Sequence, residues 1–310
     1  MRKVDDFSIN EKITVDELVK QMQASGGFTS KKLAEGTDII EEMLNDDNSL
    51  NFLSFPADIV STGTRGVIKD MIKKDWFDVV ITTCGTLDHD IARAYKDYYH
   101  GSFDLDDSEL RKKGMHRLGN IVFPEGNYGI IIEEKMKEFL QSIFDSGMKE
   151  LSTYELCWEI GKRINNEDSI LYWCYKNKVP MVIPGITDGA VGYQVWQFSQ
   201  RHDFKINVLK DEKMLSDLVW SAAKSGALII GGGISKHHVI WHQQFRGGLD
   251  YAVYITTAVE YDGSLSGART REAISWGKVN ENARHITVES DATIALPIIY
   301  AALLDRKPSA

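Results

Sequence analysis

The stretch Ala227-Leu228-Ile229-Ile230-Gly231-Gly232-Gly233-Ile234-Ser235-Lys236-His237-His238 contains a short apolar run, three glycines and a polar segment. Four apolar residues bounded by glycine are typical of a buried strand, and residues 235–245 are expected to form a helix. The glycines leave room for a phosphate-bearing ligand to reach backbone N–H groups at the start of that helix. The stretch therefore predicts a strand–turn–helix unit with a ligand site at its turn.

The same alternation of strands and helices extends to both sides of this unit. Strands are expected at residues 50–55, 78–83, 181–184, 205–209, 227–230, 250–255 and 285–288. Helices are expected near residues 65–73, 90–98, 133–144, 154–164, 213–224, 235–245 and 291–304. Apolar strands that alternate with helices predict an α/β fold, a Rossmann-like, doubly wound and mostly parallel sheet. Residues 100–127 are expected to form a loop excursion from this sheet.

The N-terminal residues have a helical pattern of their own. Thr14-Val15-Asp16-Glu17 is a capping-box signature that opens an expected helix at residues 14–24, and a second helix is expected after Thr29. No Pro- or Gly/Ser-rich linker divides the rest of the chain. We therefore expect an N-terminal helical extension at residues 1–48 and one α/β domain at residues 49–310.

Composition places the chain among soluble proteins. It has 310 residues, 43% hydrophobic and 26% charged, and a formal net charge of −9, which argues against a nucleic-acid or anionic-membrane surface. Cys84, Cys157 and Cys174 have no metal-ligand spacing and are expected to be free thiols in a reducing cytoplasm. The charged N-terminus is unlike a signal peptide, and the longest apolar run, residues 292–304, is too short to span a bilayer.

Small and polar residues follow five of the expected strands. In an open parallel sheet, ligands bind beyond the carboxyl ends of the strands. For one such segment an ordinary turn is the better interpretation, but five together favour a crevice in which a dinucleotide lies close to the backbone. The GxGxxG fingerprint itself is absent. The segments are Ser61-Thr62-Gly63, Thr82-Thr83-Cys84-Gly85, Thr187-Asp188-Gly189, Gly231-Gly232-Gly233 and Thr256-Thr257-Ala258.

Charged residues near these segments have two interpretations each. Lys278 is either a solvated lysine or, beside Ile274, Trp276 and Val279, a desolvated amine able to form a Schiff base. A histidine after the triplet is either structural or a general base, and at most one of His237 and His238 should face the crevice. Taken one at a time, the nearby acidic residues are turn formers or helix caps. As a group, and with the Trp276 ring, they could bind a polycation. These acids are Asp88, Asp90, Asp188, Glu260, Asp262 and Glu272.

Three motifs together carry a resemblance to a known family. GGGxxKHH at residues 231–238, EYDGSxSGA at 260–268 and EAxSWGK at 272–278 resemble deoxyhypusine synthase, and the resemblance extends from about Asn51 to Asp291-Ala292. It implies NAD-dependent transfer of the 4-aminobutyl group of spermidine to a lysine of the hypusine-bearing translation factor. It also implies a cytoplasmic homotetramer with NAD sites at a subunit interface, and an N-terminal helix, residues 15–22, able to cover the entrance.

The resemblance also implies roles for individual residues. Lys278 would hold the aminobutyl group as an imine, with His237 as the base. The positions that match those around NAD are Ser61, Thr83, Gly85, Asp188, Gly232, Thr257, Ala258, Asp291 and Ala292. The positions that match contacts to the amine are Asp88, His237, Gly263, Ser264, Glu272 and Trp276.

Some positions depart from the eukaryotic-type pattern and are similar to archaeal-type members. Tyr193 and Leu265 stand where aspartates would face the polyamine, His89 replaces an acid, and Asp58 and Trp241 replace asparagines. These changes leave the donor amine open. Two alternatives also stay open: transfer to a free diamine, as in homospermidine synthase, and a non-catalytic NAD-binding interaction protein.

Overall fold

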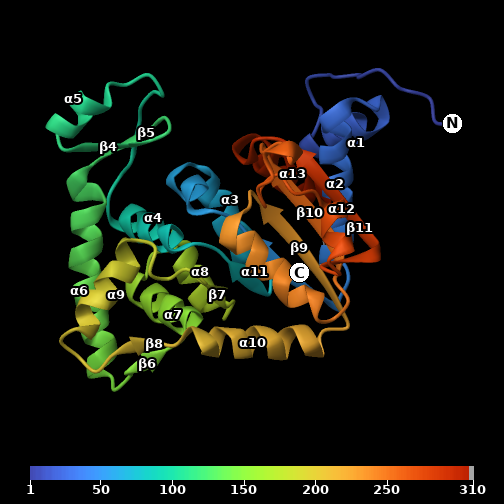
Figure 1. Ribbon diagram of the computed structural model, residues 1–310. Helices are drawn as coiled ribbons and strands as arrows, with labels where there is room; N and C mark the ends of the chain where they lie inside the picture. The colour runs from blue at the N-terminus through green and yellow to red at the C-terminus, as the bar shows by residue number, and fades with distance from the viewer. Residues whose placement is uncertain (307–310) are drawn as a thin grey trace. The chain divides into compact units, whose positions relative to one another are not determined.

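The computed structural model describes residues 1–306, which form two compact units (Figure 1). The first unit contains residues 1–55, 74–81 and those from 214 onward, and the second contains residues 56–73 and 82–213. Within the described residues, no helix is both long and apolar enough to cross a membrane. The expected division between residues 48 and 49 stays a prediction.

The first unit is built on parallel strands in the order β11-β10-β9-β1-β2. The central strands pair Phe52 with Ala227 and Ala252 with the same residue, so that buried side chains lie level across the sheet. This confirms the predicted α/β fold with a mostly parallel sheet. The strands are β1 (Ser49–Ser54), β2 (Val79–Ile81), β9 (Lys224–Ile230), β10 (Leu249–Thr256) and β11 (Val279–Glu289).

Helices cover both faces of this sheet, because successive strand residues point to opposite sides. Val253 faces α2, where a side chain at Gly36 would come within 3.3 Å of it, and the ring of Tyr254 lies under Lys236 of α11. Figure 1 shows α11 in front of β9. The helices of this unit are α1 (Val15–Ser25), α2 (Phe28–Leu44), α11 (Gly233–Gln244), α12 (Thr270–Ser275) and α13 (Ala292–Arg306), with a 3₁₀ turn η3 (Glu260–Asp262).

The first helix confirms the predicted capping box. The Thr14 side chain accepts from the backbone N–H of Glu17, and the Glu17 side chain accepts from that of Thr14. The helix packs on α2 and α13, with Val19 fully buried and Asp16 paired with Arg306. Its suggested role as a cover over the site entrance stays a prediction.

The second unit is mainly helical with two small sheets. An antiparallel sheet has the order β3-β5-β4, and β6 pairs with β8 in parallel. The helices are α3 (Thr64–Lys73), α4 (Cys84–Tyr95), α5 (Asp107–Lys112), α6 (Gly129–Asp145), α7 (Thr153–Ile164), α8 (Ile170–Lys176) and α9 (Ala190–Ser199), with 3₁₀ turns η1 (Ala57–Ser61) and η2 (Glu125–Asn127). The strands are β3 (Tyr99–His100), β4 (Met115–Leu118), β5 (Ile121–Pro124), β6 (Glu150–Leu151), β7 (Met181–Val182) and β8 (Lys205–Ile206). Helix α10 (Val208–Ser221) carries the chain out of this unit.

A fully buried carboxylate organises the second unit. Asp90 accepts from Arg65 Nε at 2.7 Å and from Ser169 Oγ at 2.6 Å. It also accepts from the first backbone N–H groups of α8, those of Ile170 at 3.1 Å and Leu171 at 2.9 Å. An unpaired buried charge is costly, so Asp90 requires these partners. Because the partners lie on or beside different helices, the four bonds tie α3, α4 and α8 together.

Three expectations about local structure were wrong. The strand expected at residues 205–209 ends at Ile206, because the Asn207 side chain accepts from Leu209 N and begins α10. Residues 100–127 are not a loop: Leu118 pairs with Ile121 across a two-residue turn whose Gly119 has φ +60°. Helices α8, α9 and α12 were not expected, because they are 7, 10 and 6 residues long and give only short periodic patterns.

Candidate active site

A cavity of about 370 Å³ lies in the first unit, on the face of its sheet that α11 covers. Helix α11 forms one wall, and Tyr254 of β10 contributes to the floor. The opposite wall comes from the segment before α12, from α12 itself and from the residues that follow it. The cavity is lined by Lys236, His237, Ile240, Trp241, Gln244, Tyr254, Leu265, Ala268, Arg269, Glu272, Ala273, Trp276 and Lys278. One cavity is therefore lined by four residues whose roles were predicted from the sequence: His237, Glu272, Trp276 and Lys278.

The placement of Lys278 follows from how α12 ends. Gly277 has φ +66°, a left-handed conformation that favours glycine. Its N–H donates to Ile274 O at 2.9 Å, and the N–H of Lys278 donates to Ala273 O at 2.9 Å. These two bonds form a Schellman motif, which reverses the chain and directs it into β11. The sequence Trp-Gly-Lys thus ends the helix and fixes the backbone of the lysine.

The Lys278 side chain is buried, with 9% of the residue exposed. Its Nζ lies 5.3 Å from the centroid of the Trp276 ring and 5.9 Å from that of Trp241. Within residues 1–306, no carboxylate lies close enough to form an ion pair with it. The Lys278 amine is therefore buried within 6 Å of the centroids of two indole rings, in the cavity that His237 also lines.

His237 lies on the α11 wall of the same cavity. Its ring stacks on Trp241 one turn further along, with centroids 5.8 Å apart and planes at 21°. Burial, and then the positive charge of Lys278, lower the pKa of His237 below its ordinary value of 6.5. The imidazole is therefore neutral at neutral pH, which is the form that accepts a proton.

We expect replacement of Lys278 by alanine to raise the pKa of His237, because the variant lacks the neighbouring positive charge. The pKa should stay below 6.5, because the burial is kept. NMR titration of the imidazole resonances in both proteins measures this, with His116 of the second unit as an internal reference. An unchanged pKa of His237 would show that the two side chains do not interact.

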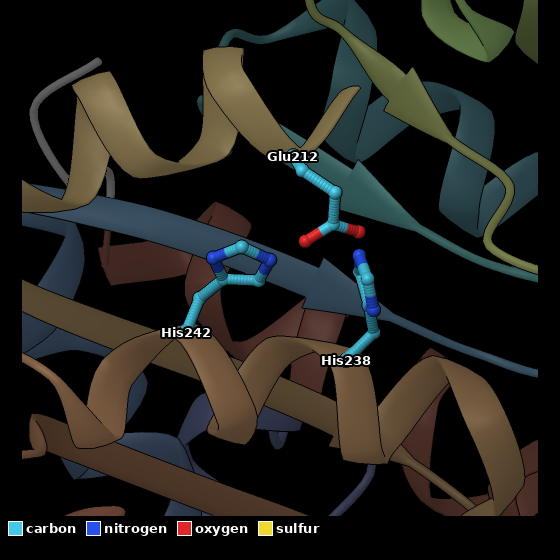
Figure 2. Close-up of side chains that lie close together, drawn as sticks. All are labelled: Glu212, His238 and His242. Carbon is cyan, nitrogen blue, oxygen red and sulfur yellow. The ribbon is translucent and has the colours of Figure 1, made fainter. Parts of the chain in front are cut away.

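The adjacent histidine has a different environment, as the helical geometry predicts. His238 does not line the cavity. Figure 2 shows its side chain with that of His242, on the next turn of α11, and the two rings meet edge to face with centroids 5.0 Å apart. Only one of the two neighbouring histidines is therefore available to the cavity.

The charge in the cavity is unusual for a site expected to take a polyamine. Among the described residues that line it, Glu272 is the one carboxylate, and Lys236, Arg269 and Lys278 carry cationic groups. Trp241 and Trp276 supply large aromatic faces that are 41% and 62% exposed. An amine in this cavity would be attracted by Glu272 and by the indole faces, because cations bind over aromatic rings.

Two structural features explain why glycine stands at the three positions of the triplet. Gly231 and Gly233 both have φ +67°, and the space beside Gly233 is open at the start of α11. A side chain at Gly232 would come within 2.4 Å of the Cα of Ser266, so this position is filled by neighbouring backbone. Of Gly232 and Gly233, only Gly233 has no neighbouring atom within 4 Å of where a Cβ would lie.

Five residues predicted around NAD lie at the carboxyl ends of the first unit's strands. Gly232 follows β9, Thr257 and Ala258 follow β10, and Asp291 and Ala292 follow β11. Asp291 also caps α13 by accepting from Thr293 N at 2.7 Å. Gly263 and Ser264, predicted to contact the amine, lie beside η3 and are exposed. Their contacts with ligands stay predictions.

The remaining predicted residues belong to the second unit. Ser61 is buried at the end of η1, Thr83 and Gly85 lie at the start of α4, and Asp188 is exposed in the turn before α9. Asp88 is buried, which raises its pKa, and it accepts from Tyr128 Oη at 3.0 Å and from the first N–H groups of α9. Asp88 thus has a structural role as a helix cap, and its contact with substrate stays a prediction.

The residues that depart from the eukaryotic-type pattern are also distributed over both units. Leu265 and Trp241 line the cavity of the first unit. His89 lies in the second unit beside Tyr98, and burial, followed by the charge of Arg93, lowers its pKa to about 4. Tyr193 is exposed on α9, beside the ring of Trp196.

Sequence reasoning gave no role to several residues that line the cavity, among them Lys236, Tyr254 and Arg269. Tyr254 and Arg269 lie outside the motifs, and Lys236 was quoted in the glycine–histidine motif without a role. The available signal was spacing, because Lys236 and Ile240 are four residues apart and share one face of α11.

Comparisons with known proteins give a consistent result. A family model described as deoxyhypusine synthase matches residues 17–303. Proteins named "Probable deoxyhypusine synthase" from Picrophilus torridus and Thermoplasma acidophilum are 57% and 54% identical to this chain. The alignments cover 97% and 98% of this chain, and 96% and 97% of the relatives. A crystal structure from Entamoeba histolytica that carries the deoxyhypusine synthase name has a TM-score of 0.65 at 19% identity, over 96% of each chain, and is similar in fold.

Proposed function

The chain belongs to the deoxyhypusine synthase family, a family of aminobutyltransferase enzymes, and from this we propose the donor, cofactor and acceptor of its reaction. The proposed donor is spermidine, the cofactor is NAD, and the acceptor is a lysine of the hypusine-bearing translation factor. The observation that carries the proposal is the buried Lys278, which shares a cavity with His237, Glu272 and Trp276.

The residues of the first unit fit a dinucleotide. Parallel strands end in small residues, the space at Gly233 is open, and α11 begins there with its unsatisfied N–H groups. The positive end of a helix favours phosphate. When bound, NAD would take up a hydride from the donor amine and later return it. We propose Gly232, Thr257, Ala258, Asp291 and Ala292 as contacts in this unit, and Ser61, Thr83, Gly85 and Asp188 remain predicted contacts.

The chain's own groups suit the transfer itself. Oxidation of the carbon beside the secondary amine of spermidine gives an imine. Lys278 Nζ adds to the imine carbon, the C–N bond to the diaminopropane part breaks, and that amine leaves with a proton. His237 is positioned to accept and return protons at Nζ, because its neutral ring lies in the same cavity. The acceptor lysine would then displace Lys278 from the imine and take over the aminobutyl group, and this new imine would be converted to an amine by hydride from the reduced cofactor.

Exclusion of water matters because water hydrolyses imines. In a single chain, the indole of Trp276 is 62% exposed beside Lys278. A second subunit that covers this aromatic wall would dry the site, which supports the proposed homotetramer with sites at an interface. We also place the protein in the cytoplasm, where buried free thiols such as Cys84, Cys157 and Cys174 stay reduced.

The acceptor is tested with spermidine labelled in its butyl part. We expect label to enter the translation factor in the presence of NAD, and not a variant factor that lacks the acceptor lysine. A parallel reaction with putrescine as the only acceptor tests the homospermidine alternative. Label found only in free polyamine would remove the protein-modifying activity and favour that alternative.

The donor needs its own test, because Leu265 and Trp241 leave the cavity with a single carboxylate. A panel of diamines and triamines, with mass detection of the amine released, identifies the preferred donor. A preference for an amine other than spermidine would keep the chemistry and change the proposed substrate.

A further inference from the structure

The segment of residues 257–269 connects β10 to α12 and forms part of the cavity wall. Leu265, Ala268 and Arg269 line the cavity, and Gly263 and Ser264 are predicted to contact the amine. Its regular structure consists of the short turn η3, so its position depends on contacts with its neighbours. The side chain that reaches it from α11 is Lys236.

Lys236 is among the most buried side chains of the protein, with 1% of the residue exposed. Its Nζ donates to the backbone carbonyls of Leu265 and Ala268, each at 2.7 Å. The same atom lies 4.2 Å from the centroid of the Tyr254 ring, on the floor of the cavity. The amine therefore joins α11, β10 and the 257–269 segment at one point.

The physical chemistry of this arrangement is unusual for a lysine. Burial lowers the pKa of Lys236 to about 8, and among residues 1–306 no carboxylate forms an ion pair with it. A buried ammonium is tolerated where it is hydrogen-bonded. Here it donates to two carbonyls of one segment and also lies over one aromatic ring. Removal of the amine would leave both carbonyls without this donor.

A second contact holds the same segment from the other side. Ser266, which lies between the two bonded carbonyls, packs against the backbone of Gly232 with no room for a side chain there. Inside the segment, the N–H groups of Gly267 and Ala268 both donate to Ser264 O at 3.1 Å. The turn at residues 264–268 is therefore a compact unit, which Lys236 fastens to α11.

We propose that Lys236 is a positioning residue, which holds the 264–268 turn against α11 and so sets the part of the cavity wall that lies opposite His237, on the same wall as Lys278. Its own amine is not the nucleophile, because both of its strong hydrogen bonds are to backbone and its surface is covered. The effect on catalysis rests on the proposed function, whereas the effect on the turn does not.

The test compares Lys236→Met, which keeps the length of the side chain, with Lys236→Arg, which keeps donors. Hydrogen exchange measured by mass spectrometry on peptides that cover residues 259–269 reports opening of the turn. We expect exchange about tenfold faster in Lys236→Met, equivalent to the loss of one or two hydrogen bonds, and a rate near wild type in Lys236→Arg. Lys210→Met is the matched control, because Lys210 also donates to a backbone carbonyl, that of Glu150, but is 42% exposed and lies in the second unit.

Steady-state kinetics with spermidine is the second readout. We expect KM for spermidine to rise about tenfold in Lys236→Met with a smaller change in kcat, and Lys236→Arg to restore most of the loss. Should Lys236→Met not fold, Lys236→Gln, whose shorter, uncharged amide still carries N–H donors, is measured in its place and should fall between arginine and methionine.

Two results would overturn the proposal: unchanged exchange of residues 259–269 in the methionine or glutamine variant, or equal losses in the arginine and methionine variants. If the turn loosens but no variant, nor the wild type, uses spermidine, the positioning role stands and the proposed function fails.

Discussion

Replacing Lys278 by alanine should abolish the covalent adduct that borohydride traps after incubation with spermidine and NAD. The amine would be absent from the cavity between Trp241 and Trp276, so no imine to the enzyme can form. We expect turnover to fall on the order of 10³-fold or more, as when a nucleophile is removed from other enzymes. Mass spectrometry of the reduced protein measures the adduct directly.

Controls separate loss of chemistry from loss of structure. NAD binding should persist in Lys278→Ala, because the side chain is not among the predicted cofactor contacts. Lys31→Ala, at an exposed lysine of α2, should keep the full adduct. An undiminished adduct in Lys278→Ala would show that another amine is the nucleophile. Absence of any adduct in the wild type would instead favour a non-catalytic NAD-binding protein.

Replacing Asp90 by alanine should destabilise the second unit more than any surface change. Asp90 is fully buried, and the variant would leave the guanidinium of Arg65 and the first N–H groups of α8 without their acceptor. Breaking a buried pair by removal of one partner costs about 3–5 kcal/mol in the free energy of unfolding. Urea unfolding followed by circular dichroism, at fixed protein concentration, measures the difference.

The matched control is Asp107→Ala. Asp107 also accepts two hydrogen bonds from an arginine, Arg117, but both groups lie at the surface, where solvent screens the pair. We expect little change in its unfolding midpoint. Equal effects of the two substitutions would mean that the burial of Asp90 adds nothing to the stability of this unit.

Local signals accounted for much of what the sequence predicted. Thr14 and Glu17 form the expected capping box, because both partners lie within one turn of the chain. The apolar runs that became β1, β9 and β10 are recognisable alone, because burial on both faces of a parallel sheet demands continuous apolar residues. The three motifs also gave the family, which the comparisons confirm.

Helices α8 and α9 were missed because some of the contacts that stabilise them come from residues far away in the chain. Helix α8 is seven residues long and begins on the carboxylate of Asp90, about 80 residues earlier in the chain. Helix α9 begins on Asp88 in the same manner, from about 100 residues away. Ser169 also caps α8 locally by accepting from Tyr172 N, but the carboxylates of Asp88 and Asp90 reach their helices only when the chain is folded.

The chemical groups, the strand–helix alternation and the family can all be read from the order of the residues. The tertiary structure alone decided that Trp241 faces Lys278, that Lys236 joins α11 to the 264–268 turn, and that His238 lies away from the cavity. The physical reason is distance along the chain. Helix α11 and Lys278 are separated by about 40 residues, and only the packing of β10, α12 and the Schellman turn at Gly277 brings them to one cavity.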